Sequence, residues 1–157
     1  MYSDVIAELA PSGILRAGIN LANIFLVTGK SEDGIPEGVS PDIARAIADR
    51  LGVKVSYVPC ETPGGTAEAI KKEACDIAMI ADEPARAEFI SFTEPYVEIE
   101  ATYIVPEGSS FQTCEDVDQS GVRIAVSGTS AYDLFLTRSL NHAELHRAEG
   151  LPAAVDL

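Results

Sequence analysis

The sequence predicts an α/β protein in which parallel-rich sheets are flanked by helices. A short apolar run over residues 77–81 has the composition of a strand buried on both faces, as strands of parallel sheets are. Apolar residues recur at helical spacing over residues 43–51, between two stretches of strand character at residues 14–19 and 53–59. Strands and helices that alternate in this way are typical of α/β folds.

The N-terminal segment predicts a short helix, the first strand and two loops. Ser3 is expected to cap the helix, which a proline and a glycine end before the strand begins. Residues 20–25 follow that strand and are expected to form a loop at the carboxyl edge of the sheet. Residues 30–36 contain an Asp-Gly pair, which predicts a turn.

The clearest helix start in the sequence is Ser40-Pro41-Asp42. Ser40 is expected to be the N-cap, Pro41 the first helical residue, and Asp42 a charge that the helix dipole favours. Gly52 follows the last apolar residue of this helix and is expected to end it. A second helix is predicted over residues 64–73, directly before the buried strand.

The C-terminal half predicts further strands and helices. Residues 98–105 are rich in β-forming side chains and are expected to form a strand. A short helix at residues 113–119 and strands at residues 122–126 and 144–148 are expected after it. The Ser-Gly-Thr-Ser run at residues 127–130 is expected to open another helix.

Charge and hydropathy exclude several classes of partner. The chain carries 25 acidic and 11 basic residues, a formal net charge of −14. Because such a charge repels phosphate backbones and anionic lipids, nucleic-acid and membrane-surface partners are not expected. No apolar run approaches the ~20 residues that span a bilayer. The first residues lack the basic start and apolar run of a secretory signal, so no signal is expected in this chain.

No cofactor, metal or catalytic motif is predicted. Cys60, Cys75 and Cys114 are odd in number and widely spaced, which indicates neither a disulfide framework nor a zinc motif. His142 and His146 have the spacing of zinc-binding histidines but lack the intervening glutamate and a third ligand, so surface histidines are expected. The sequence contains no phosphate-binding loop, nucleophile elbow or dinucleotide fingerprint.

Arg86 is the first candidate binding residue. It follows the buried strand, and ligands of open α/β sheets bind outside the carboxyl ends of the strands. Its guanidinium offers a planar fork of donors that matches a carboxylate. The alternative is an ordinary surface arginine that pairs with Asp82, Glu83 or Glu88. Asp82 and Glu83 could also compete with an acidic ligand for the guanidinium, or bind a cationic group.

The Gly128-Thr129-Ser130 run is the second candidate. Gly128 allows close approach of a ligand to the backbone, and the following helix presents N–H groups at its positive end. Thr129 and Ser130 can add hydroxyl donors. The alternative for these residues is simple helix capping.

Several segments together carry a resemblance to a known family. They are Leu15-Arg-Ala-Gly18, Gly38-Val-Ser-Pro-Asp42, Leu51-Gly52, and the stretch from Asp76 through Arg86 to Tyr96. In their order and spacing the chain resembles the bacterial extracellular solute-binding proteins of family 3, which have the type II periplasmic-binding fold. The resemblance covers essentially the whole chain.

The resemblance implies a two-lobed fold. Residues 1–98 would form the first lobe without its C-terminal return segment, residues 99–105 a hinge strand, and residues 106–157 part of the second lobe. Because chains of the family continue beyond this point, the second lobe is expected to be incomplete.

The resemblance also implies roles for individual residues. Arg86 would clamp the carboxylate of a solute, and residues 128–130 resemble an element of the second lobe that meets the same carboxylate. Asn23 and Phe25 stand where family members often carry a loop whose aromatic side chain covers the substrate. Core packing is the alternative for Phe25.

The function that the resemblance implies is capture of a small carboxylate-bearing solute, such as an amino acid, for an ABC-type transporter. A periplasmic location, a membrane permease as partner and no enzymatic activity follow from the same likeness. One alternative is an enzyme, since residues 111–119 are similar to those of cyclohexadienyl or arogenate dehydratases, with Glu83 as the candidate general acid. The other is a truncated remnant that binds nothing and forms a homodimer through unpaired strand edges or domain swapping.

Overall fold

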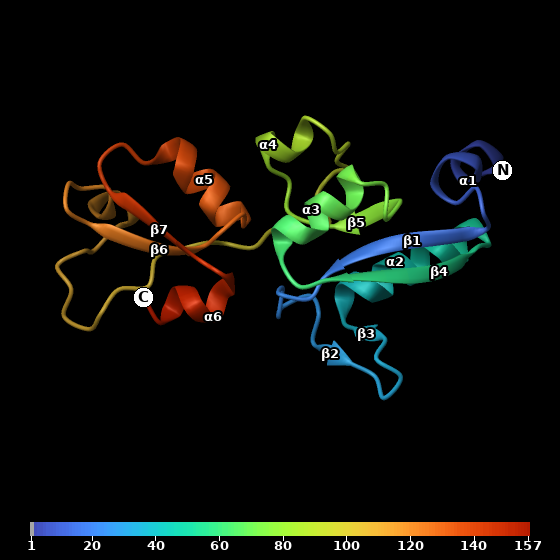
Figure 1. Ribbon diagram of the computed structural model, residues 1–157, viewed down its shortest axis with the longest axis horizontal. Helices are drawn as coiled ribbons and strands as arrows, with labels where there is room; N and C mark the ends of the chain where they lie inside the picture. Colours follow the sequence, from blue (N-terminus) through green and yellow to red (C-terminus); the bar gives the residue numbers. More distant parts are fainter. Residues whose placement is uncertain (1) are drawn as a thin grey trace. The chain divides into compact units, whose positions relative to one another are not determined.

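The structure, a computed structural model, describes residues 2–157. The chain divides into two compact units (Figure 1). The first unit runs to Ala81 and includes Glu88–Ile90, and the second comprises Asp82–Ala87 and Ser91–Leu157. Each unit has its own parallel sheet and its own hydrophobic core. The α/β class with parallel sheets is therefore confirmed.

A three-stranded parallel sheet forms the centre of the first unit, in the order β4-β1-β5. The central strand β1 (Ile14–Asn20) pairs along its whole length with β4 (Lys54–Cys60) and over a shorter stretch with β5 (Ile77–Met79). All three strands lie where the sequence predicts them. Since parallel strands end at the same edge of a sheet, the loops that follow them share one edge.

Helix α2 (Val39–Leu51) packs on this sheet through small apolar side chains. Ala44 is fully buried in a cluster with Ala17 and Ile19 of β1. The small side chains at this contact let the helix approach the sheet closely. Helix α3 (Pro63–Lys71) contacts all three strands.

The start of α2 differs from the prediction that Ser40 is its N-cap. The helix begins at Val39 with Gly38 as the N-cap, so Ser40 lies buried in the first turn and makes no side-chain cap. Gly38 has φ 129°, a conformation that glycine reaches without steric cost, and this lets the chain enter the helix earlier than Ser40. The predicted end is confirmed, since Gly52 takes the left-handed conformation there.

The remaining elements of the first unit are small. Helix α1 (Ser3–Leu9) begins after Tyr2, and the prediction that Ser3 caps it is wrong because Ser3 lies within the helix. The predicted turn at residues 30–36 joins the short antiparallel strands β2 (Gly29–Lys30) and β3 (Pro36–Glu37).

The second unit is built on a two-stranded parallel sheet. Its elements in chain order are helix α4 (Pro84–Ala87), the 3-10 helix η1 (Cys114–Val117), β6 (Arg123–Ser127), α5 (Ala131–Ser139), β7 (Glu144–Ala148) and α6 (Gly150–Val155). Val117, Ile124, Val126 and Leu136 form its core. The bounds of β7 are those predicted, whereas α6 has no counterpart in the prediction.

The strand expected over residues 98–105 is not formed. This segment has no secondary structure, and the partners of every strand in the described residues lie elsewhere. A strand needs hydrogen bonds from a neighbouring strand, so side chains of high β-propensity do not form one by themselves. The division into residues 1–98, 99–105 and 106–157 stays a prediction.

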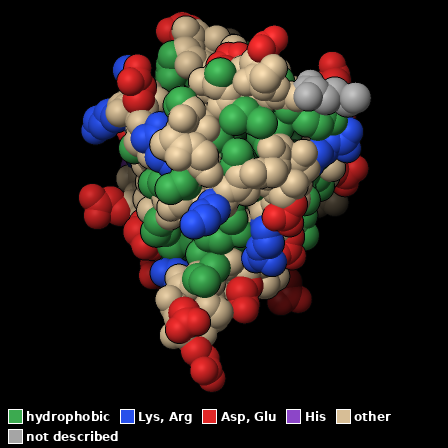
Figure 2. All heavy atoms as spheres, turned by 90° about the vertical axis from the view of Figure 1, so that its right-hand side faces the viewer, with side chains coloured by type: hydrophobic (Ala, Val, Ile, Leu, Met, Phe, Trp, Pro, Cys, Tyr) green, Lys and Arg blue, Asp and Glu red, His purple; other side chains and the backbone are tan. Residues whose placement is uncertain are grey.

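The surface carries charges of both signs despite the net charge of −14. Figure 2 shows one face, on which acidic and basic side chains both surround exposed hydrophobic side chains. Within residues 2–157, no helix is long and apolar enough to cross a membrane.

Candidate functional site

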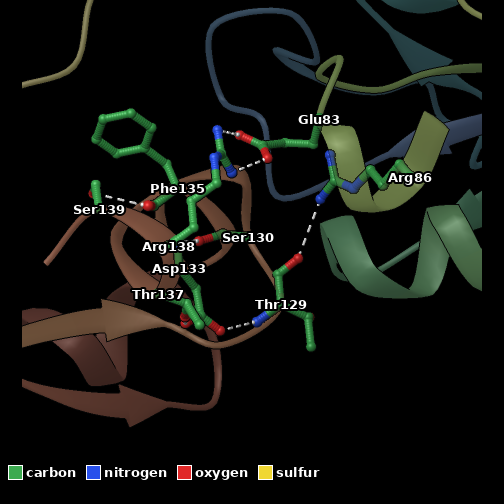
Figure 3. A network of polar contacts seen from close by, with 9 residues as sticks. All are labelled: Glu83, Arg86, Thr129, Ser130, Asp133, Phe135, Thr137, Arg138 and Ser139. Carbon is green, nitrogen blue, oxygen red and sulfur yellow. Dashed lines mark hydrogen bonds and ion pairs between the residues drawn. The ribbon is translucent and has the colours of Figure 1, made fainter. Parts of the chain in front are cut away.

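The guanidinium of Arg86 is the centre of a polar network in the second unit (Figure 3). Arg86 lies on the short helix α4 and is only 3% exposed. Its Nη2 donates a hydrogen bond to the carbonyl oxygen of Thr129 at 3.1 Å. Burial lowers the pKa of the Arg86 guanidinium, and the nearby Glu83 carboxylate opposes that shift. Arg86 is therefore a buried cation directed at the backbone of residues 127–130, not the surface arginine of the alternative interpretation.

The carboxylate of Glu83 binds a different arginine from the one that the sequence suggests. Both of its oxygens accept hydrogen bonds from Arg138 on α5, Oε2 from Nη1 and Oε1 from Nη2, the latter at 3.2 Å. The Glu83 side chain is only 7% exposed, while that of Arg138 is 44% exposed. Asp82, in contrast, is exposed. The alternative in which Glu83 pairs with Arg86 is therefore not formed, because Arg138 bonds both carboxylate oxygens.

The loop between β6 and α5 holds the second group of candidate residues. Gly128 is half-buried and donates its N–H to the carbonyl of Ala148 at 2.9 Å. Thr129 is exposed and has φ 60°, which is rare for a β-branched residue. Its hydroxyl donates to the Gly128 carbonyl at 2.6 Å. Thr129, which has this unusual φ, is also the residue whose carbonyl oxygen accepts the hydrogen bond from Arg86.

Ser130 is the N-cap of α5, as the capping interpretation predicts. It is buried, and its Oγ accepts a hydrogen bond from the N–H of Asp133 at 3.1 Å. The side chain of Asp133 returns to the loop, where Oδ2 accepts the N–H of Thr129 at 2.9 Å. The N–H of Thr129, which precedes the helix, and that of Asp133, in its first turn, are thus bonded within the protein.

Asp133 is a functional candidate that the sequence analysis missed. Its carboxylate is buried and also accepts hydrogen bonds from Thr137 at 3.1 Å and from Nε of Arg147 at 2.9 Å. It therefore connects the loop, helix α5 and strand β7. The available signal was its spacing, because an acidic residue three positions after a Ser N-cap is typical of a capping box.

Asn23 and Phe25 belong to the first unit, in the loop that follows β1. Asn23 Oδ1 accepts the N–H of Phe25 at 3.3 Å, which fixes a local turn. The Phe25 side chain is 71% exposed, so the alternative that it packs in the core is wrong.

The other groups singled out in the sequence do not form a site. Cys60 and Cys75 are buried, and Cys114 is exposed. In the described part of the chain, no three His, Cys, Asp or Glu side chains are placed to hold a metal ion. A hollow of about 430 Å³ in the second unit is lined by Phe111 and Arg123, among others, and none of the predicted binding residues lines it.

Comparison with known proteins identifies one family. Residues 25–148 match the bacterial extracellular solute-binding proteins, family 3. A cyclohexadienyl dehydratase of Pseudomonas aeruginosa is 30% identical over 142 residues, which are 88% of this chain and 52% of that protein. The amino-acid-binding protein AabA of Dichelobacter nodosus is 25% identical over 107 residues, 67% of this chain and 42% of that protein. The chain thus spans about half the length of these relatives.

Solved structures have the same fold. An ancestral amino-acid-binding protein, described as a precursor of cyclohexadienyl dehydratase, matches with a TM-score of 0.75 and 25% identity over 97% of this chain and 68% of its own. A protein from Wolinella succinogenes, complexed with lysine, matches with a TM-score of 0.70 and 22% identity. That match covers 92% of this chain and 63% of the other.

Proposed function

Because the chain belongs to the bacterial extracellular solute-binding proteins of family 3, we propose that it binds a small solute that carries a carboxylate, an amino acid in the first instance. Arg86 binds the carboxylate, and Thr129 and Ser130 offer their hydroxyls beside Gly128, since the N–H groups of these three residues are bonded within the protein. The function is binding and not catalysis.

The buried guanidinium of Arg86 is the observation that carries this proposal. An arginine that is 3% exposed has lost most of its hydration, and its hydrogen bond to the Thr129 carbonyl joins a cation to a neutral acceptor. Compared with a neutral carbonyl, a carboxylate adds Coulombic attraction to the guanidinium and a second, parallel hydrogen bond. A carboxylate that reaches Arg86 therefore gains more than the Thr129 carbonyl does.

The amino-acid class rests on the names of similar proteins. AabA is an amino-acid-binding protein, and the solved structures include a lysine complex and an arginine-bound protein. The exposed carboxylate of Asp82, four residues before Arg86, adds a group that can attract an ammonium. Asn23 and Phe25 of the first unit stay separate candidates for contact with the solute.

The same family membership supports a role in transport. As a solute-binding component, the protein passes its solute to an ABC permease in the membrane and acts in the periplasm. Neither nucleic acid nor a cofactor has a role in this function. A homodimer formed through unpaired strand edges stays a prediction.

Thermal unfolding in the presence of each of the twenty amino acids tests the binding proposal. A ligand at a hundred times its Kd stabilises the folded state by ~2.7 kcal/mol, which raises the Tm by several degrees. Arg86→Ala is expected to abolish the shift, and Arg86→Lys to lose most of it because lysine lacks the planar fork.

Arg45→Ala is the matched control, since Arg45 is an exposed arginine of the first unit. A shift that survives in Arg86→Ala and in Arg86→Lys contradicts the role of Arg86. A cooperative melt with no shift for any of the amino acids contradicts the amino-acid class.

Dehydratase activity is the second candidate, and the 30% identity to a cyclohexadienyl dehydratase favours it. The acid in that reaction must carry a proton, and Glu83 was its candidate. Both oxygens of Glu83 accept hydrogen bonds from Arg138, so neither is placed to give a proton to a substrate, which disfavours that role. Turnover of prephenate or arogenate by the purified protein would establish the enzyme.

A further inference from the structure

Two arginines, Arg86 and Arg138, lie near the buried carboxylate of Glu83. Glu83 stands directly before α4, and its carbonyl accepts the N–H of Arg86 at 2.8 Å, so the two residues lie in the same helical turn. Burial lowers the pKa of Arg86, and the Glu83 carboxylate opposes this shift through space. Its two oxygens, however, are bonded by Arg138, which comes from α5. The nearer arginine in the sequence is thus not the one that holds the carboxylate.

Burial of the Glu83 carboxylate without a cationic partner has a high cost in free energy. With 7% of its side chain exposed, the carboxylate has little water to replace a lost ion pair. If Arg138 is removed, Arg86 can supply the guanidinium, because it lies in the same helical turn as Glu83. When the Arg86 guanidinium forms a bidentate ion pair with Glu83, its N–H donors point away from the Thr129 carbonyl.

Arg138 is suited to hold Glu83 in place. Its guanidinium matches both carboxylate oxygens at once, which is the geometry that distinguishes arginine from lysine. It also lies over the ring of Phe135 on the same helix, with 5.2 Å from Cζ to the ring centroid. This contact restricts the side chain and reduces the entropy lost on pairing.

We propose that Arg138 is a positioning residue, which binds Glu83 so that the Arg86 guanidinium stays directed at the loop that carries Thr129. The inference rests on the proposed function, because the loop is where the solute carboxylate binds. It assigns Arg138 an effect on solute binding although Arg138 need not contact the solute. Figure 3 shows the three charged side chains in this arrangement.

The first test needs no ligand. The midpoint of urea unfolding is measured for Arg86→Gln in three backgrounds: the natural chain, Arg138→Gln, and Glu83→Gln with Arg138→Gln. If Arg86 pairs with Glu83 once Arg138 is gone, Arg86→Gln lowers the midpoint most in the Arg138→Gln background. The effect then returns to its natural size in the background that lacks both Glu83 and Arg138. An equal effect of Arg86→Gln in all three backgrounds overturns the proposal.

The second test measures the Tm shift that each of the twenty amino acids produces at about 1 mM, a concentration at which all of them dissolve. Arg138→Gln is expected to abolish the Tm shift that an amino acid produces in the natural chain. Glu83→Gln together with Arg138→Gln is expected to restore at least half of it, because no carboxylate then competes for Arg86. A merely structural ion pair predicts no such recovery of binding.

Arg123→Gln is the matched control, since it removes an exposed arginine from the same unit and lies outside the network. Binding by Arg138→Gln at the natural level overturns the proposal, as does a double variant that binds no better than Arg138→Gln. If the natural chain binds no amino acid, the proposed function fails. The unfolding experiment then still decides whether Arg138 keeps Glu83 from Arg86.

Discussion

Asp118 accepts three backbone N–H groups at the turn before β7. They come from Asn141 at 2.9 Å and from His142 and Ala143 at 2.8 Å each. The hydrogen bonds from the backbone of Ala143 and Asn141 contribute most to lowering the pKa of the Asp118 carboxyl, from its usual 3.8 to about 2. The ionised form of Asp118 therefore stabilises the folded second unit.

We expect Asp118→Asn to lower the free energy of unfolding at pH 7, because an amide has one acceptor oxygen and no charge. A carboxyl whose folded pKa is depressed contributes stability above its unfolded pKa and loses it as the pH falls through the folded pKa. The difference between the natural chain and the variant is thus expected to shrink from pH 4 toward about 2. Urea unfolding at a series of pH values measures it.

Asp33→Asn controls for the change in net charge, since Asp33 is exposed in the turn between β2 and β3. A difference between Asp118→Asn and the natural chain that persists unchanged down to pH 2 contradicts the role assigned to the ionised carboxylate.

Single residues also show where sequence reasoning reaches its limit. Arg86 was singled out because it follows a buried strand, and the structure buries its side chain. Its relation to Glu83 was misjudged, because nearness in the sequence favoured that pair. Arg138, 55 residues away, takes the carboxylate instead. The choice between two possible partners depends on the packing of α5, which no local pattern contains.

At the scale of one element, the start of α2 depends on Gly38. A β-carbon at this position would lie 2.6 Å from the carbonyl oxygen of Leu26 and 3.0 Å from the backbone nitrogen of Thr28. A strained backbone conformation alone costs ~1–3 kcal/mol. We expect Gly38→Ala to lower the free energy of unfolding by more than this, because a collision with rigid backbone atoms adds to the strain. Thermal or urea unfolding measures the loss.

Gly34→Ala separates the two causes. Gly34 also has a positive φ, 76°, but a β-carbon there meets no atom within 4 Å. Its substitution therefore carries the conformational strain alone. Equal losses for Gly34→Ala and Gly38→Ala would show that the contact with the Leu26 carbonyl has no energetic weight.

Elements with a complete local signal were predicted well, and those that depend on distant partners were not. Strand β7 (Glu144–Ala148) matches its predicted bounds because turn residues precede it and its neighbour β6 is close in the chain. Residues 98–105 are richer in β-forming side chains than β7 but pair with no described strand. The N-cap of α2 was misplaced because the sequence signal of Ser40 does not reveal that a glycine two residues earlier can start the helix.

For the whole molecule, the order of strands and helices and the spacing of a few motifs predicted both the α/β class and the family, which the match over residues 25–148 confirms. These features can be predicted from the sequence because they depend on topology and not on particular side-chain contacts. The position of Asp133 in the network and the pairing of Arg138 depend on those contacts, and the sequence alone did not reveal them.

Because the two units have separate cores, we expect each to lose stability independently of the other. Leu15 is fully buried in the first unit, beside Ala48, and Leu136 is buried in the second unit with Val126. We expect Leu15→Ala and Leu136→Ala each to destabilise their own unit by ~2–5 kcal/mol, the usual cost of a cavity left by a buried leucine. Because each core closes on residues of its own unit, the loss is expected to remain local.

Hydrogen exchange of backbone amides distinguishes local from global loss. Leu15→Ala is expected to accelerate exchange in β1 and to change exchange in β6 much less, and Leu136→Ala is expected to do the reverse. Each variant is the control for the other, since both remove the same side-chain atoms. If either substitution accelerates exchange equally in β1 and β6, the chain unfolds as one cooperative body. The stability of the Arg86 network in the second unit then depends on the core of the first.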